Sequence, residues 1–95
     1  MTLEIQNVTV IGAGTMGHAL ALVHALGGCD TALYDRDPNV LARAGDLIAA
    51  ACATLVEAGA IVEQDAQDAQ DRIVITDTLE DATERADLIV EAVVE

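Results

Sequence analysis

The chain has no lysine, no phenylalanine and no tryptophan among its 95 residues, and it has a single tyrosine. Its four basic residues are all arginines, and they face 17 acidic residues, so that the formal net charge is −13. Proteins that bind nucleic acid need basic surface and commonly use aromatic platforms on which bases stack. The composition therefore argues strongly against a nucleic-acid partner and leaves a core of valine, isoleucine, leucine and alanine.

Cysteine and long apolar runs are also scarce. Cys29 and Cys52 are too far apart in sequence for a Cys-x-x-Cys redox or zinc motif, so we expect two reduced thiols and no metal site. The first residues lack a basic region, and we expect no segment as long as a membrane span. The sequence thus predicts one small cytoplasmic domain, residues 1–95, with no membrane partner.

The most informative segment present is residues 8–17, where a β-branched apolar run leads into Gly-x-Gly-x-x-Gly and an alanine- and leucine-rich helical pattern follows. In this order Gly12 permits a sharp exit from a strand, Gly14 leaves room for a pyrophosphate, and Gly17 lets the helix approach the sheet. The amides of the first helical turn then face the anion at the positive end of the helix dipole. The segment predicts a site for a dinucleotide.

The surroundings of the motif agree with this interpretation. A helix is predicted over residues 15–26 with Gly27-Gly28 as its stop, and a second strand over residues 31–34 ends at Asp35. A carboxylate there can accept hydrogen bonds from both hydroxyls of an adenosine ribose, but it repels the extra phosphate of NADP. The predicted cofactor is therefore NAD, and FAD, which uses the same kind of loop and acid, stays open as an alternative.

Helices and strands alternate through the rest of the chain. Asp37 and Pro38 supply a capping acid and a favourable first residue for a long helix that stops near Gly59. The later elements are a solvated helix over residues 62–71, a strand over 72–76, a short helix over 78–85 and a strand over 87–94. The pattern predicts an α/β fold of the Rossmann type: a doubly wound parallel sheet of order 3-2-1-4, covered on both faces and truncated after its fourth strand.

Three segments together resemble one enzyme family: residues 10–17, residues 34–35 and residues 86–95, the last of which carries two glutamates. They are similar to the N-terminal NAD-binding domain of the L-3-hydroxyacyl-CoA dehydrogenases. The helical insertion between the second and third strands, which includes residues 55–59, is similar as well. The resemblance implies an oxidoreductase of fatty acid metabolism in which a 3-hydroxyl is oxidised and a hydride passes to NAD.

The resemblance also implies where NAD makes contact: the glycine loop, the acid after the second strand, and the end of the fourth strand, with Glu95 nearest the nicotinamide. Glu91 is expected to face solvent only. The predicted cofactor contacts are Gly12, Gly14, Thr15, Met16, Gly17, Asp35, Arg36, Ala92 and Glu95.

No position matches the catalytic residues of this family. Its enzymes use a histidine base oriented by a glutamate, while serine and asparagine polarise the oxygen, and all of these lie beyond the part that the chain resembles. His18 and His24 lie on the predicted helix behind the glycine loop, where His18 at most approaches the cofactor. We therefore expect an NAD-binding domain or fragment that contains no catalytic residue and does not turn over alone.

The substrate and partners stay open at this point. The family holds the phosphates of CoA with basic residues of the helical insertion, whereas residues 44–71 contain no cation. The small-molecule substrate of a full-length enzyme is therefore an acyl-CoA or a related 3-hydroxy acid, for example a carnitine-like or sugar-acid compound. The alternative is a stand-alone nucleotide-binding or protein-interaction module, in which the uncovered fourth strand recruits a partner or a second copy to form a homo-oligomer.

The net charge of −13 leads to a prediction about salt. NAD is an anion, so the general field of the chain opposes its binding, but exposed charges beyond roughly 10 Å are screened at 0.1 M salt. In calorimetric titrations we expect NAD to bind more weakly at low ionic strength than at moderate salt. Affinity that rises steadily as salt is removed would contradict this argument.

Overall fold

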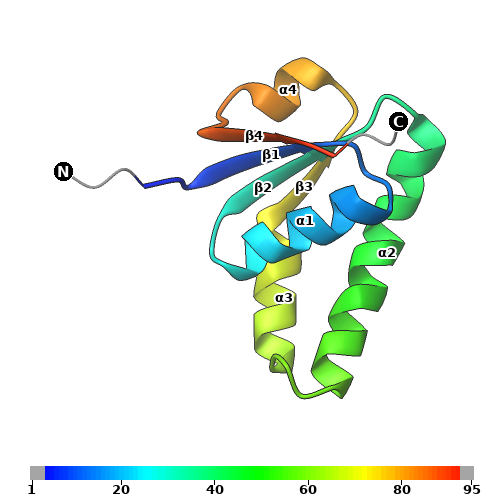
Figure 1. The fold of residues 1–95 in the computed structure, drawn as a ribbon, viewed down its shortest axis with the longest axis vertical. Helices are drawn as coiled ribbons and strands as arrows, with labels where there is room; N and C mark the ends of the chain where they lie inside the picture. Colours follow the sequence, from blue (N-terminus) through cyan, green and yellow to red (C-terminus); the bar gives the residue numbers. More distant parts are fainter. Residues whose placement is uncertain (1–3, 93–95) are drawn as a thin grey trace.

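Strands and helices alternate along residues 4–92, the part of the chain that the computed structural model describes (Figure 1). The elements in chain order are β1 (Asn7–Ile11), α1 (Thr15–Leu26), β2 (Asp30–Tyr34), α2 (Pro38–Glu57), α3 (Glu63–Arg72), β3 (Ile73–Thr76), α4 (Leu79–Thr83) and β4 (Leu88–Glu91). The four strands pair in parallel in the order β3-β2-β1-β4. The predicted Rossmann-type sheet and its strand order are confirmed.

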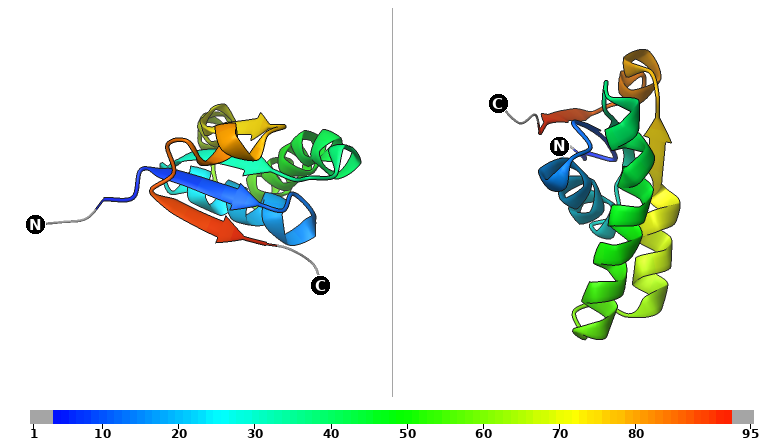
Figure 2. Two further views of the ribbon diagram at one scale, coloured as in Figure 1. Left: turned by 90° about the horizontal axis from the view of Figure 1, so that it is seen from above. Right: turned by 90° about the vertical axis from the view of Figure 1, so that its right-hand side faces the viewer.

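The helices lie on the two faces of this sheet, with α1, α2 and α3 on one face and α4 on the other (Figures 1 and 2). The strand order accounts for this arrangement: the chain moves from β1 to β3 in one direction and then returns past β1 to β4, and crossovers of a single hand place their helices on opposite faces for the two directions. Alternation along β1 shows the same two faces: Val8 and Val10 belong to the core beside α1, and the Thr9 hydroxyl donates to the carbonyl of Ala82 in α4.

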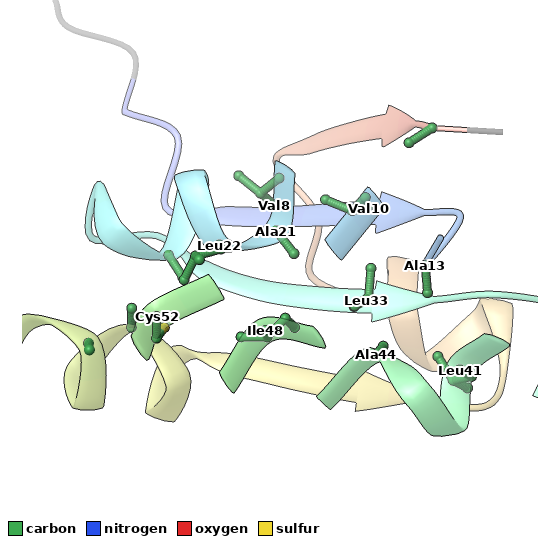
Figure 3. Close-up of a cluster of buried hydrophobic side chains, with 14 residues drawn as sticks. Val8, Val10, Ala13, Ala21, Leu22, Leu33, Leu41, Ala44, Ile48 and Cys52 are labelled. Carbon is green, nitrogen blue, oxygen red and sulfur yellow. The ribbon is translucent and has the colours of Figure 1, made fainter. Parts of the chain in front are cut away.

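The core lies between the sheet and the first three helices (Figure 3). Strand residues Val8, Val10 and Leu33 are at most 1% exposed, and small side chains of the helices pack against them. The helix contribution is Ala21, Leu22 and Ala25 from α1, Leu41, Ala44, Ile48 and Cys52 from α2, and Ala66 and Ala69 from α3. Alanine lets the helix backbones come close to the sheet, so a tight core forms in a chain with almost no aromatic residues.

The second face of the sheet is covered less than the sequence predicts. Within residues 4–92 only α4, which has five residues, packs on it. Val74 and Ile89 share this face with Thr9, because Thr9 pairs with Ile89 and Ala32 links Thr9 to Val74 across the register. Val74 is 59% exposed and Ile89 is 48% exposed. The expectation that both faces are covered is therefore only half met.

Helix α2 corrects another expectation. Asp37 caps it by accepting a hydrogen bond from the Asn39 amide at 2.9 Å, and Pro38 is its first residue, as the sequence predicts. The helix has 20 residues and is long and apolar enough, by length and composition, to cross a membrane, so the expectation that no segment has this length is wrong. One stripe of the helix, from Leu41 to Cys52, is buried in the core. Together α2 and α3 form a hairpin that extends beyond the sheet (Figure 2).

The last elements are shorter than predicted. Thr78 caps α4 by accepting from the Asp81 amide, but the helix ends at Thr83 instead of residue 85. Strand β4 ends at Glu91, and residues 93–95 lie outside the described part of the chain. Both cysteines are free thiols, and burial raises the pKa of Cys52.

Asp87 ties the start of β4 to the start of β1. Its Oδ2 accepts hydrogen bonds from the amides of Gln6 at 3.0 Å and Asn7 at 2.9 Å and from Asn7 Nδ2 at 3.4 Å. The hydrogen bond from the Asn7 amide, followed by that from Gln6, holds the pKa of this carboxyl below its ordinary value. Because the folded state favours the carboxylate, this contribution to stability is present at neutral pH and is lost as the pH falls below about 4.

We therefore expect Asp87→Asn to lower the thermal midpoint by a few degrees at neutral pH, because the amide lacks the charge that strengthens these hydrogen bonds. The difference from the wild type should narrow as the pH falls through the acidic range. Asp46→Asn is the matched control, since Asp46 is an exposed acid on α2. Equal midpoints for wild type and Asp87→Asn at pH 7, measured by circular dichroism, would contradict this role.

Candidate functional site

The loop between β1 and α1 turns sharply at Gly12. Gly12 has φ of 106°, a conformation that favours glycine, and its amide donates to the carbonyl of Tyr34 at the end of β2 at 2.7 Å. This hydrogen bond continues the pairing of β1 and β2 by one residue beyond the strand. The loop therefore leaves the sheet at its carboxyl edge, the edge at which open parallel sheets bind ligands.

Gly17 and Gly14 have opposite surroundings. A Cβ at Gly17 would lie 1.4 Å from the carbonyl oxygen of Gly12, so this position has no room for any side chain. A Cβ at Gly14 would have no heavy atom within 4 Å and would point into open space. Gly17 thus brings α1 against the end of β1, and Gly14 leaves an open cradle in front of the helix.

The amino end of α1 is free to receive an anion. Gly14 is the N-cap residue and offers no side chain to bond the first amides, and helix geometry leaves the amides of Thr15, Met16 and Gly17 without an intrahelical acceptor. Thr15 and Met16 are exposed. These amides and the helix dipole together carry roughly half a positive charge. The feature favours a phosphate group and requires no lysine.

Asp35 follows β2 and lies directly beside this loop. One carboxylate oxygen, Oδ2, accepts from the Ala13 amide at 2.8 Å, and the other, Oδ1, accepts from the Asp37 amide at 2.8 Å. An ionised carboxylate has about four acceptor positions, so two remain for the hydroxyls of a ribose. The sequence predicted the position of this acid but gave no sign that it also holds the glycine loop.

Of the other predicted cofactor contacts, the structure describes Arg36 and Ala92. Arg36 is exposed next to Asp35. Ala92 is 8% exposed, and its amide donates to the Ile11 carbonyl at 2.7 Å, so it lies beside the start of the glycine loop. Glu91 is exposed, as expected. Glu95 lies outside the described residues.

His18 has a contact that the sequence reasoning missed. Its Nδ1 lies 2.8 Å from the Gly14 carbonyl oxygen, one turn back along α1. The only signal in the sequence was that His18 lies four residues after Gly14, the N-cap of α1. A single histidine on a helix does not ordinarily form a hydrogen bond with the backbone of that helix. His24 lies in the last turn of the same helix, away from the loop.

These features fit a dinucleotide and are found together at one edge of the sheet. The open space at Gly14 has room for a diphosphate, the first-turn amides are donors for an anion, and the carboxylate of Asp35 has free acceptors for a ribose diol. A second groove, lined in part by Thr9, Val74 and Ala82, lies on the face of the sheet that α4 covers. The fold and the site thus define a Rossmann-type dinucleotide-binding domain.

Comparison with known proteins identifies the family. Residues 7–95 match the model of the 3-hydroxyacyl-CoA dehydrogenase NAD-binding domain. This match covers nearly the whole chain, and the chain therefore belongs to this family of NAD-binding domains, which come from NAD-dependent dehydrogenases. The resemblance inferred from the sequence is confirmed, and so is NAD as the cofactor of the family.

Individual relatives agree with this assignment. The chain is 37% identical over 93 residues to 3-hydroxyadipyl-CoA dehydrogenase of Escherichia coli and 33% identical over 93 residues to a probable 3-hydroxybutyryl-CoA dehydrogenase of Bacillus subtilis. It superposes on the crystal structure of 3-hydroxybutyryl-CoA dehydrogenase from Escherichia coli with a TM-score of 0.88 at 35% identity. Each alignment covers 97% or 98% of this chain. The aligned part is 19% of the 3-hydroxyadipyl-CoA dehydrogenase, 32% of the B. subtilis protein and 20% of the chain in the crystal structure. The chain thus spans a third or less of these proteins.

The two glycines allow binding and folding to be separated by matched substitutions. Gly14→Ala should fold normally, because its Cβ meets nothing, but its methyl group enters the cradle and should weaken NAD binding by roughly tenfold or more. Gly17→Ala should lower the free energy of unfolding by about 1–3 kcal/mol as the loop is displaced, and should also lose NAD.

Gly45→Ala on α2 is the control for both variants, since its Cβ would lie 3.7 Å from Ile75 Cδ1, an ordinary contact. It should leave NAD binding unchanged. The measurements are chemical denaturation and calorimetry. Unchanged stability of Gly17→Ala, or unchanged NAD affinity of Gly14→Ala, would show that the loop geometry is not as described.

Proposed function

We propose that this chain holds NAD for a dehydrogenase that oxidises the 3-hydroxyl of a small substrate, and that catalysis depends on residues outside it. One observation carries the proposal: the Gly14 cradle, the free amides of α1 and the carboxylate of Asp35 meet at the carboxyl edge of the sheet. Bound there, NAD supplies the acceptor for a hydride.

The residues have separate roles in this proposal. The amides of Thr15 and Met16 bind the diphosphate, and the missing side chain of Gly14 lets it come close to the backbone. Asp35 accepts hydrogen bonds from the adenosine ribose, and its bonds to the Ala13 and Asp37 amides fix the carboxylate before the ligand arrives. This preorganisation lowers the entropy lost on binding. Ala92, beside the start of the glycine loop, is assigned to the side toward the nicotinamide.

The same carboxylate provides the discrimination between the two nicotinamide cofactors. The phosphate that NADP carries on this ribose would be placed against the negative charge of Asp35. Binding of NADP would also leave an acceptor position of the Asp35 carboxylate unpaired, because the phosphate replaces the ribose hydroxyl that would donate to it. We therefore assign NAD and not NADP to the site.

The chain provides no general base in this proposal. His18 is bonded to the backbone of its own helix, and His24 lies at the far end of α1. A base within hydrogen-bond reach of a substrate hydroxyl is required for the reaction, so it must come from another part of the enzyme. The chain alone should bind NAD without oxidising a substrate.

The substrate class follows from the family and from the charge of the α2–α3 hairpin. The relatives compared above are named for CoA-linked 3-hydroxy substrates. Between Ala44 and Asp71 all the charged residues of the hairpin are acidic: Asp46, Glu57, Glu63, Asp65, Asp68 and Asp71. Such a surface repels the phosphates of CoA, so the substrate is an acyl-CoA that is held elsewhere or a related 3-hydroxy acid.

The test of cofactor choice is calorimetric titration of the chain with NAD and with NADP. We expect NAD to bind and NADP to bind at least about tenfold more weakly. Bringing the extra phosphate of NADP against the like charge of the Asp35 carboxylate costs about a kcal/mol or more. Asp35→Asn should narrow the difference between the affinities for NAD and NADP. Asp30→Asn, at the opposite end of β2, should leave that difference unchanged. No binding of NAD, or equal binding of both cofactors, would contradict the proposal.

The absence of catalysis is tested separately. The purified chain, mixed with NAD and 3-hydroxybutyryl-CoA, should produce no NADH beyond the rate without protein. Turnover above that rate, reduced in a His18→Ala or His24→Ala variant, would contradict the assignment of the base to another part of the enzyme.

The exposed second face of the sheet favours one other candidate, a module that binds another protein or a second copy. Val74 and Ile89 on this face are each about half exposed, and large apolar side chains in such positions commonly mark contact surfaces. Size-exclusion chromatography with and without NAD separates the two candidates. A well-defined dimer that does not depend on NAD would favour the module, and a monomer of low stability would favour the dehydrogenase domain.

A further inference from the structure

The Gly14 carbonyl accepts two hydrogen bonds, and both come from the same residue. The His18 backbone amide donates at 3.0 Å, which is the first bond of α1, and His18 Nδ1 lies at 2.8 Å from the same oxygen. Because a carbonyl oxygen can only accept, Nδ1 must carry a proton. In the neutral ring Nε2 is then unprotonated.

These two hydrogen bonds to one carbonyl oxygen fix the orientation of the peptide that faces the ligand. The peptide between Gly14 and Thr15 is planar and trans, so the Thr15 N–H points in the direction opposite to the Gly14 C=O. When the carbonyl is held toward His18 inside the first turn, the Thr15 amide is held outward, toward the open cradle. The second hydrogen bond also polarises the peptide and makes its N–H a stronger donor.

Gly14 itself cannot order the first turn of α1. At an ordinary helix start a serine, threonine or aspartate side chain caps the first turn and orders it. Here the cap has no side chain, and the space that one would fill must stay open for the diphosphate. His18, half-buried one turn later, bonds the carbonyl of the same turn, and its side chain stays more than 4 Å from the place of a Gly14 Cβ, so the cradle is left clear.

We propose that His18 is a positioning residue for the cofactor diphosphate, which acts by holding the Gly14–Thr15 peptide so that the Thr15 amide points at the anion. The inference rests on the proposed NAD site and adds to it. His18 positions the peptide through the hydrogen bond from Nδ1 and not through the charge of its ring. An asparagine at this position has its Nδ2 donor at the same number of bonds from the backbone as Nδ1 of histidine, so it should replace the histidine.

The binding test uses His18→Ala, His18→Asn and, as the matched control on the same helix, His24→Ala. Alanine is the better helix former, so His18→Ala should fold at least as well as the wild type, as a thermal melt would show. In calorimetry we expect His18→Ala to weaken NAD binding by roughly three- to tenfold, the scale of one hydrogen bond. His18→Asn and His24→Ala should both remain within about twofold of the wild type on the same scale.

The outcomes separate this inference from the proposed function. If the wild type binds NAD and His18→Ala binds equally well, or if His18→Asn is as weak as His18→Ala, the positioning role is wrong and the NAD site stands. If the wild type does not bind NAD, the proposed function fails, and the role of His18 fails with it.

A second readout requires no cofactor. In the wild-type chain at a pH where the ring is neutral, the ¹⁵N chemical shifts of His18 should show the proton on Nδ1, whereas free histidine favours Nε2. The shifts of His24 give the internal comparison, and their assignment follows from the signals lost in His18→Asn. A proton on Nε2 of His18 would overturn the inference whatever the affinity for NAD.

Discussion

The structure depends on one close contact, between Gly17 of α1 and the carbonyl of Gly12 at the end of β1. Any side chain at Gly17 would overlap that oxygen, so the contact exists only because the position is glycine. It brings the start of a 12-residue helix against the carboxyl edge of the sheet. The free amides of the helix are thereby placed where the ends of β1, β2 and β4 meet, and the anion site is a consequence of this packing.

Two side chains then stabilise the loop from different sides. Asp35 bonds the Ala13 amide from the end of β2, and His18 bonds the Gly14 carbonyl from within α1. Neither bond occupies the space in front of Gly14. The loop is therefore ordered by groups behind and beside it, and its open side is left for the ligand. A strongly acidic chain without lysine can hold an anion in this way, because the positive partner is the backbone itself.

Much of this could be predicted from the sequence, because the informative signals are local. The glycine spacing gave the loop and the bounds of α1, Asp37 and Pro38 gave the start of α2, and the alternation of elements gave the sheet order. Asp35 was placed correctly because it ends a short apolar run.

The remainder depends on contacts that no local pattern encodes. The bonds of Asp87 to Gln6 and Asn7 join residues 80 or more positions apart, and the bond of Asp35 to Ala13 depends on two loops meeting in space. The bounds of α2 were predicted closely, but its apolar character was not, because its many alanines do not appear as one apolar run, although together they make a helix long and apolar enough to cross a membrane. The exposure of Val74 and Ile89 could not be foreseen, because it depends on how little of the second face the short helix α4 covers.

The central claim is that the diphosphate of NAD lies at the amino end of α1, with a ribose on Asp35. A crystal structure of the chain with NAD tests it most directly. We expect phosphate oxygens within hydrogen-bond distance of the Thr15 and Met16 amides, and both hydroxyls of the adenosine ribose on the Asp35 carboxylate. NAD bound in the groove beside α4, with the glycine loop empty, would contradict the account.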